Sequence, residues 1–374
     1  LVSLVGLVLG IVGIYQINIS GSLIEDMPKN APFFKDIQFY DQSFNGIVPM
    51  EIWVDSKRKN GIIKPATLKR MDRLQNTISE IPELAPPLSI VNAVKFVKQA
   101  YYNGNPNYYN LPTAQENRFI LPYVNNNKVK NPLLDSYVDS TGQLGRITTY
   151  LKDVPTQKME IIQTDLLEAI EKIFPKDRYQ VNITGKAVLF LKGTKYLINN
   201  LFLSLSLAIL LIALFMAFLF RSFKMIVISL IPNLLPLIIT AGVMGFSGIP
   251  LKPSTILVFS VAFGISVDDT IHFLAKYRQE LISNGWRIRA AVFAALRETG
   301  ISMLYTSIVL FFGFSVFLSS NFGGTRALGG LVSVTLLMAM LANLILLPSL
   351  LISLEDAVSN EKVIKPSKIN ILDP

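Results

Sequence analysis

The stretch that decides the fold is Gly264-Ile265-Ser266-Val267-Asp268-Asp269-Thr270-Ile271-His272, which places two adjacent aspartates within an apolar segment. The residues just upstream, 254–265, carry no charge. A charged side chain at the centre of a bilayer costs roughly 2.5–3.5 kcal/mol on insertion scales, so such groups are rare and usually line a pathway or relay. The single histidine of the chain, His272, follows Asp268 by one helical turn. The pattern predicts a membrane helix that moves protons or ions.

The composition places the chain among membrane proteins, because 51% of its residues are hydrophobic and its mean hydropathy is +0.44. A helix that crosses a bilayer needs about 20 predominantly apolar residues. We expect six membrane segments, at about 1–14, 197–220, 225–246, 254–274, 301–318 and 328–354. The first segment looks cut short, because the chain opens inside an apolar run without Met.

The basic residues of the short loops predict the orientation of these segments. One set of loops carries only Lys252 and Arg326. The other set, which we therefore place in the cytoplasm, carries Arg221, Lys224, Lys276, Arg278, Arg287, Arg289, Arg297, Lys362, Lys365 and Lys368. The formal charge of +9 is then explained largely by topology, and we expect no nucleic-acid partner.

Four parts follow from this orientation. Residues 1–17 form the first membrane helix, 18–195 an extracytoplasmic domain, 196–354 a bundle of five membrane helices, and 355–374 a cytoplasmic tail. The loop at 278–298 suggests an amphipathic helix on the cytoplasmic surface, although a simple connector is the alternative.

The extracytoplasmic domain is predicted to be α+β. Alternation of apolar residues predicts strands at 47–54, 146–153 and 179–183, and prolines at 65 and 155 open two helices between them. Strand–helix followed by strand–helix–strand fits a split β-α-β, ferredoxin-like layer. The tyrosine-rich segment 101–109 is expected to be a loop.

The acidic segment supplies the candidate site. Asp268 and His272 are four residues apart and stack on one helix face, and Asp269 is also within reach of His272. We interpret Asp268, Asp269 and His272 as a proton relay, with a structural role, bonded to Ser or Thr of a neighbouring helix, as the alternative. Possible relay partners, which could equally bond helices together, are Ser302, Tyr305, Thr306 and Asn343. Pro232 and Pro236 interrupt another segment and could act as a hinge.

Other kinds of chemistry have no support in the sequence. A glycine-rich phosphate loop is absent, so ATP is not expected to supply the energy. With one histidine and no cysteine, the chain offers no zinc site, and we expect no cofactor, no metal and no enzymatic activity.

These residues resemble the RND superfamily, in particular the C-terminal half of its MMPL branch of hydrophobe and amphiphile exporters. Gly264–Leu274 is similar to the G-x-x-x-D-[YD]-x-x-H motif of the family's fourth helix, and Ile231-Pro232-Asn233 to the preceding helix. Gly245–Leu251, Tyr277–Gly300, Leu347–Leu351 and Asp26-Met27-Pro28-Lys29 carry weaker similarity. The five helices from about 197 to 354 also resemble a sterol-sensing domain.

The resemblance implies a six-helix half of a transporter in the bacterial cytoplasmic (inner) membrane, with an inserted porter-like domain. It implies export of lipidic or amphiphilic molecules driven by protons that Asp268 and Asp269 carry. Many relatives have Asp-Tyr where this chain has Asp-Asp, which leaves the proton stoichiometry open. The family has two such halves, so we expect a missing N-terminal half or a second protomer as partner, together with protons, substrate and the bilayer. The alternatives are a SecDF-like auxiliary of protein translocation and a sterol- or lipid-sensing protein that transports nothing.

Overall fold

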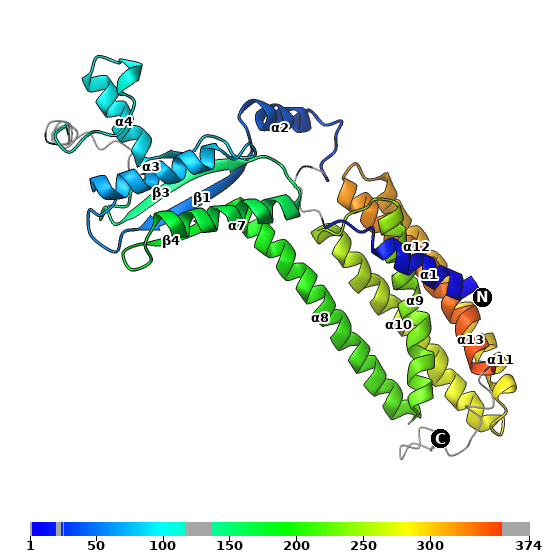
Figure 1. The fold of residues 1–374 in the computed structure, drawn as a ribbon. Coiled ribbons are helices and arrows are strands. Elements are labelled where there is room, and N and C mark those ends of the chain that lie inside the picture. Colours follow the sequence, from blue (N-terminus) through cyan, green and yellow to red (C-terminus); the bar gives the residue numbers. More distant parts are fainter. Residues whose placement is uncertain are drawn as a thin grey trace. The chain divides into compact units, whose positions relative to one another are not determined.

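The computed structural model describes residues 2–19, 24, 26–116, 118, 136–220 and 222–353. The chain divides into two compact units, which we describe separately (Figure 1). One is a helical bundle formed by residues 1–20, 25–28 and 194–374, and the other is an α/β unit formed by residues 21–24 and 29–193.

Five helical segments of the described chain are long and apolar enough to cross a membrane. Their elements are α8 (Lys186–Phe220), α9 (Phe223–Phe246), α10 (Pro253–Ser283), α11 (Ile288–Ser315) with the 3₁₀ turn η2 (Val316–Ser319), and α12 (Gly323–Leu341) with the π-helical turn η3 (Ala342–Leu346) and α13 (Leu347–Ser353). The first of the six expected segments is the helix α1 (Val2–Ile14), whose 13 described residues fall short of a span, so the count of six is not confirmed. The chain is a multi-pass membrane protein.

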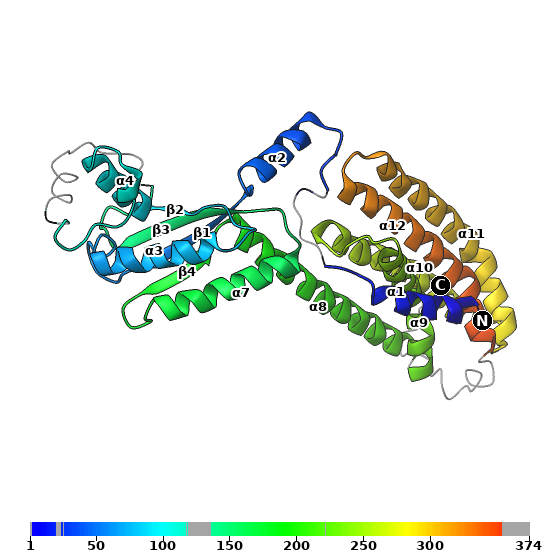
Figure 2. The same cartoon turned by 45° about the horizontal axis from the view of Figure 1, so that its top comes forward.

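Glycines allow α1 to lie directly against α9 (Figure 2). A Cβ added at Gly13 would lie 2.4 Å from the carbonyl oxygen of Gly242, and one added at Gly245 would lie 1.8 Å from the carbonyl oxygen of Gly13. Small residues at helix interfaces let backbones approach closely, which is how membrane helices gain packing energy without a hydrophobic driving force. The two backbones are therefore in contact along this seam.

The connector between the fourth and fifth expected segments differs from the prediction. The sequence suggests an amphipathic helix on the cytoplasmic surface at 278–298, or a simple connector; in the structure α10 runs on to Ser283 and α11 begins at Ile288. The apolar side chains of the early part of α11, among them Ala291 and Ala295, are fully buried in the bundle core. The apolar stripe thus packs against protein, because the two helices continue past the membrane segments and pair with each other.

The α/β unit is built on a four-stranded antiparallel sheet with the order β2-β3-β1-β4. Its strands are β1 (Val48–Asp55), β2 (Leu88–Ser89), β3 (Leu144–Leu151) and β4 (Gln180–Thr184). The predicted inward residues of β1, at 48, 50, 52 and 54, are all buried. Helices α3 (Pro65–Ser79) and α7 (Thr156–Ile173) contribute their predicted apolar stripes to the same core, and Figure 1 shows both on one face of the sheet.

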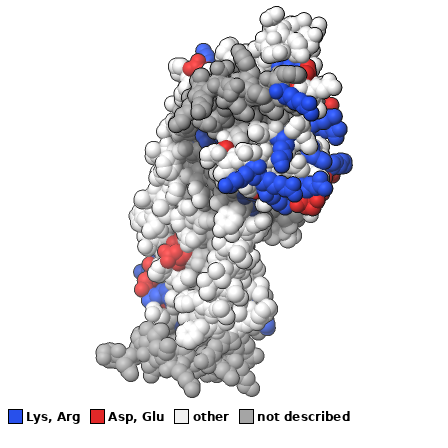
Figure 3. Space-filling model, turned by 90° about the vertical axis from the view of Figure 1, so that its left-hand side faces the viewer, with Lys and Arg blue, Asp and Glu red and all other residues white. Residues whose placement is uncertain are grey.

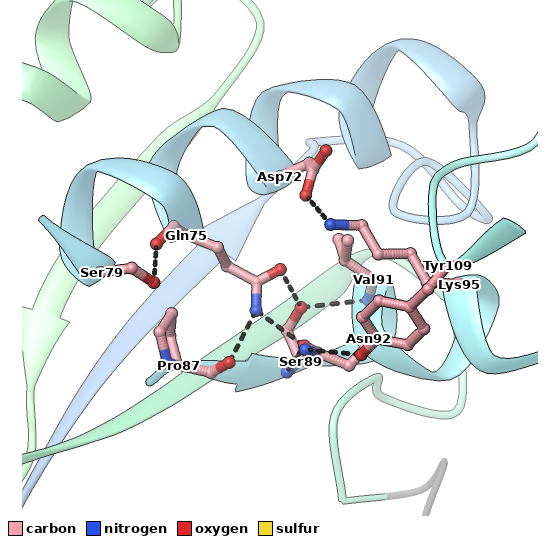
Figure 4. A network of polar contacts seen from close by, with 9 residues as sticks. All are labelled: Asp72, Gln75, Ser79, Pro87, Ser89, Val91, Asn92, Lys95 and Tyr109. Carbon is pink, nitrogen blue, oxygen red and sulfur yellow. Dashed lines mark hydrogen bonds and ion pairs between the residues drawn. The ribbon is translucent and has the colours of Figure 1, made fainter. Parts of the chain in front are cut away.

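Two helices of this unit were not predicted from the sequence: α2 (Pro32–Ser43) and α4 (Ile90–Tyr101). Ser89 begins α4, because its hydroxyl accepts a hydrogen bond from the Val91 amide (3.0 Å) and its own amide donates to Asn92 Oδ1 (2.9 Å). Gln75 of α3 donates to the Pro87 carbonyl and to Asn92, so the network in Figure 4 ties α4 to α3. The tyrosine-rich segment after α4 contains a short 3₁₀ turn, η1 (Pro106–Tyr108).

Basic side chains gather on the α/β unit, as Figure 3 shows. Exposed residues of the β1–α3 loop and of α3 contribute Lys57, Arg58, Lys59, Lys64, Lys69 and Arg73. Positive charge is therefore not confined to the loops between membrane segments, and topology explains only part of the basic excess.

Candidate functional site

The helix α10 carries the candidate site and has two different faces. Residues that point into the bundle recur every three or four positions and are buried: Val258, Ala262, Ser266, Thr270, Phe273 and Tyr277. Residues of the opposite face are exposed: Leu257, Ser260, Val261, Gly264, Asp268 and His272. The motif of the sequence therefore divides, with its hydroxyl residues turned inward and its first acidic residue turned outward.

Asp268 and His272 meet on the outward face, as the four-residue spacing predicts. The distance from His272 Nε2 to Asp268 Oδ1 is 3.4 Å. The Asp268 side chain is 73% exposed and the His272 side chain 71%, on a face whose other residues carry no charge. In a membrane such a carboxylate needs a polar partner from another segment or a water-filled space, because hydrocarbon solvates a charge poorly.

Asp269 is half-buried and turned toward α11. The hydroxyl of Ser307, a buried residue of α11, lies beside its carboxylate. The two neighbouring carboxylates thus have different surroundings, one open and one held between helices. The helix thus carries two neighbouring proton-binding groups, of which Asp269 is the more buried.

A buried polar network lies behind the acidic pair and joins three elements of the bundle. Ser266 Oγ donates a hydrogen bond to Asn233 Oδ1 of α9 at 2.9 Å, and Thr270 Oγ1 lies 2.9 Å from the same oxygen. Because Ser266 already serves Asn233 Oδ1, the one hydroxyl hydrogen of Thr270 donates to Asn343 Oδ1 of η3 at 2.8 Å, and Asn343 Nδ2 donates to the Ser266 carbonyl at 3.2 Å. Asn233, Thr270 and Asn343 are fully buried. The network fixes the rotation of α10, and with it the outward direction of Asp268.

The expected partners on α11 occupy a different surface. Ser302, Tyr305 and Thr306 are exposed, and Thr306 Oγ1 donates to backbone carbonyls of its own helix. The hydroxyl that reaches the acidic pair is that of Ser307, one residue further along α11. Asn343 contacts the inward face of α10 and bonds to Thr270 rather than to a carboxylate.

The two prolines lie inside α9, which continues through them. Between them, the side-chain amide of Asn233 donates a hydrogen bond from Nδ2 to the Ser229 carbonyl (2.8 Å), one turn earlier in the same helix. Asn233 and Ser307 were missed as site residues. The Pro-Asn pair was visible as a motif, but the direction of its side chain was not.

One known protein family matches most of the chain. The sequence profile of the MMPL family matches residues 27–368. The chain belongs to the MMPL family. The match includes residues 29–193 of the α/β unit and all five long membrane segments.

A distant relative of this MMPL protein has been described in an archaeon. The chain is 22% identical over 337 residues to "Putative membrane protein MJ1562" of Methanocaldococcus jannaschii. The alignment covers 87% of the present chain and 82% of the relative. The similarity extends over both units and supports a membrane protein.

Proposed function

We propose that this MMPL protein is a half of an RND-type transporter that uses the proton-motive force to export lipidic or amphiphilic molecules. Asp268 and Asp269 bind the transported proton, and His272 extends the path toward the cytoplasm. The protein is thus a transporter rather than an enzyme, and its cargo is hydrophobic.

One observation carries this proposal: a pair of carboxylates with different surroundings on a membrane helix. Purely structural contacts between membrane helices are commonly made by uncharged hydroxyl and amide groups, as in the Asn233–Thr270–Asn343 network. Keeping two acidic groups beside that network serves a purpose that uncharged groups do not serve. The imidazole of His272, whose Nε2 lies 3.4 Å from Asp268 Oδ1, extends the polar surface of the pair by one helical turn.

The outward face of α10 implies a covering partner. A second six-helix half, or a second copy of the chain, would shield Asp268 and His272 from lipid and leave a polar path between the two halves. Transporters of related architecture are built from two halves related by an axis along the membrane normal.

The α/β unit supports a porter role for the extracytoplasmic part. The order β4-β1-β3-β2, with α3 between β1 and β2 and α7 between β3 and β4, supports a ferredoxin-like β-α-β-β-α-β arrangement, to which α4 is added between β2 and β3. We assign it outside the cytoplasmic (inner) membrane of a bacterium, because the basic loops between membrane segments face the other side.

Transport in proteoliposomes tests the proposal. The full-length protein is reconstituted, a pH gradient is imposed, and movement of a fluorescent phospholipid and a fluorescent sterol is followed. We expect transport that depends on the gradient, is lost in Asp268→Asn/Asp269→Asn, and persists in Glu298→Gln, which changes a carboxylate at the end of the bundle that pairs with Lys276. Transport that needs no gradient would contradict the proposal, as would sterol binding without movement of either probe.

A further inference from the structure

A polar junction holds the chain at the point where it leaves the bundle for the α/β unit. Asp26 Oδ1 forms an ion pair with Lys252 Nζ, and Asp26 Oδ2 accepts a hydrogen bond from Ser254 Oγ at 3.0 Å. The backbone carbonyl of Asp26 accepts a hydrogen bond from the Gly323 amide at 2.9 Å. One acidic residue therefore touches the beginnings of both α10 and α12.

The lysine of this junction is buried. The Lys252 side chain is 8% exposed, and Asp26, at 29%, is its carboxylate partner. Lysine is almost never fully buried unless it is paired, and a charge left without its partner in such a place is strongly destabilising. The ion pair with Lys252 thus holds Asp26, and the segment of chain around it, at the N-terminal end of α10.

The packing around Asp26 leaves room for little else. A Cβ added at Gly324 would lie 2.5 Å from Asp26 Oδ2 and 2.8 Å from Ser254 Oγ. The carboxylate occupies the space that any other residue at position 324 would need. Gly324 is therefore fitted to the acidic side chain, which makes the contact specific.

The junction lies between the acidic pair and the α/β unit along the chain. Lys252 caps the N-terminus of α10, and the acidic pair lies about 16 residues further along the same helix, roughly 24 Å at 1.5 Å per residue. In the other direction, the α/β unit begins again three residues after Asp26, at Lys29. A displacement of the start of α10 would therefore pull on Asp26 and on the segment that follows it into the α/β unit.

We infer that Asp26 and Lys252, seated on Gly324, form the joint through which a change at the acidic pair of α10 reaches the segment entering the α/β unit. The inference rests on the proposed function, since it presumes that protons act at Asp268 and Asp269. Asp26 and Lys252 are positioning residues in this account. They transmit movement and bind neither proton nor cargo.

Hydrogen–deuterium exchange of the full chain in nanodiscs tests the joint without a known substrate. The variant Asp268→Asn/Asp269→Asn imitates the proton-loaded state, and exchange is read in two peptides, residues 264–272 and residues 26–31. We expect exchange of the second peptide to change by about fivefold or more, the lower end of coupling between linked sites. The same comparison is repeated in backgrounds that alter the joint.

Two backgrounds separate transmission of movement from loss of stability. Asp26→Asn/Lys252→Met removes both charges and so leaves no unpaired buried lysine. Gly324→Ala keeps both charges but displaces the carboxylate, and its matched control on the same helix is Gly330→Ala, where a Cβ would meet only the end of the Leu318 side chain at 3.0 Å. We expect the response at residues 26–31 to vanish with the charges removed and with Gly324→Ala, and to remain with Gly330→Ala.

The outcomes distinguish the joint from the proposed function. A response at residues 26–31 that survives in every background overturns the joint, as does a response confined to residues 264–272 in the otherwise unchanged chain. If the acidic-pair variant alters exchange in neither peptide, the proposed function is overturned and the inference with it.

Discussion

Replacing Thr270 with valine measures what the buried network contributes to the bundle. The two side chains have nearly the same shape, so the change removes a hydroxyl without opening a cavity. Ser266 Oγ still donates to Asn233 Oδ1, but Asn343 Oδ1, 2.8 Å from the lost hydroxyl, keeps no donor in the network.

The expected loss follows from that single unsatisfied acceptor. An unpaired buried polar group costs about 1–3 kcal/mol in water-soluble proteins. Hydrogen bonds between membrane helices average about 0.6 kcal/mol and reach about 1.7. We therefore expect the free energy of unfolding to fall by about 1 kcal/mol, a factor of about five in the unfolding equilibrium.

Fluorescence of Trp286, which lies in the turn between α10 and α11, reports unfolding in mixed SDS micelles. The chain has two tryptophans, so the series is made in a Trp53→Phe background. The matched control is Thr306→Val, whose hydroxyl donates only within its own exposed helix face. Equal stability of the two variants would refute the reasoning, and a loss above about 4 kcal/mol would indicate repacking beyond one hydrogen bond.

Three further outcomes follow from the packing and charges of the two units. Gly245→Val drives a side chain into the backbone of α1 and should separate α1 from α9, seen as loss of cysteine cross-linking between engineered pairs on these helices. Ser89→Ala removes the cap of α4 and should lower the stability of the α/β unit by about 1 kcal/mol in thermal denaturation. The Thr113 amide and then the Lys98 ammonium lower the pKa of Glu116 from 4.5 to about 2, so its stabilisation is present above pH 4.5 and is lost as the pH falls toward 2; Glu116→Gln should remove this dependence in a circular-dichroism titration.

Each of these has a contrary result. Cross-linking that survives Gly245→Val would mean that α1 does not depend on the glycine seam. Unchanged stability in Ser89→Ala would assign the start of α4 to Gln75 and Asn92 instead. A pH profile that Glu116→Gln leaves in place would assign the acid sensitivity to other carboxylates of the unit.

The elements that could be predicted from the sequence were those in which apolar residues recur at the regular spacing of a strand or a helix. Alternation in β1 and the apolar stripes of α3 and α7 fixed which residues face the core, because a strand or helix has only one way to bury such a pattern. The helix α4 was missed because its signal lies in the cap at Ser89, two residues after Pro86-Pro87, a pair of prolines that indicates a turn. The polar start of α8, from Lys186, was likewise hidden by the onset of hydrophobicity at 197.

The candidate site was predictable along one helix and unpredictable between helices. The spacing of Asp268 and His272 determines that they meet, whatever surrounds them. Which hydroxyl of α11 reaches Asp269 depends on the rotation of that helix, and a rotation of one residue exchanges Thr306 for Ser307. The role of Asn233 required the positions of α9, α10 and η3 together, which no single segment contains.

Proton flux through the reconstituted full-length protein tests the central claim most directly. A pH-sensitive dye inside proteoliposomes follows proton movement, driven by a membrane potential, in the parent and in Asp268→Asn, Asp269→Asn and Glu298→Gln. We predict that either aspartate change abolishes the flux while Glu298→Gln preserves it, with all four proteins equally folded. Undiminished flux in both aspartate variants would contradict the account and leave the acidic pair a structural role.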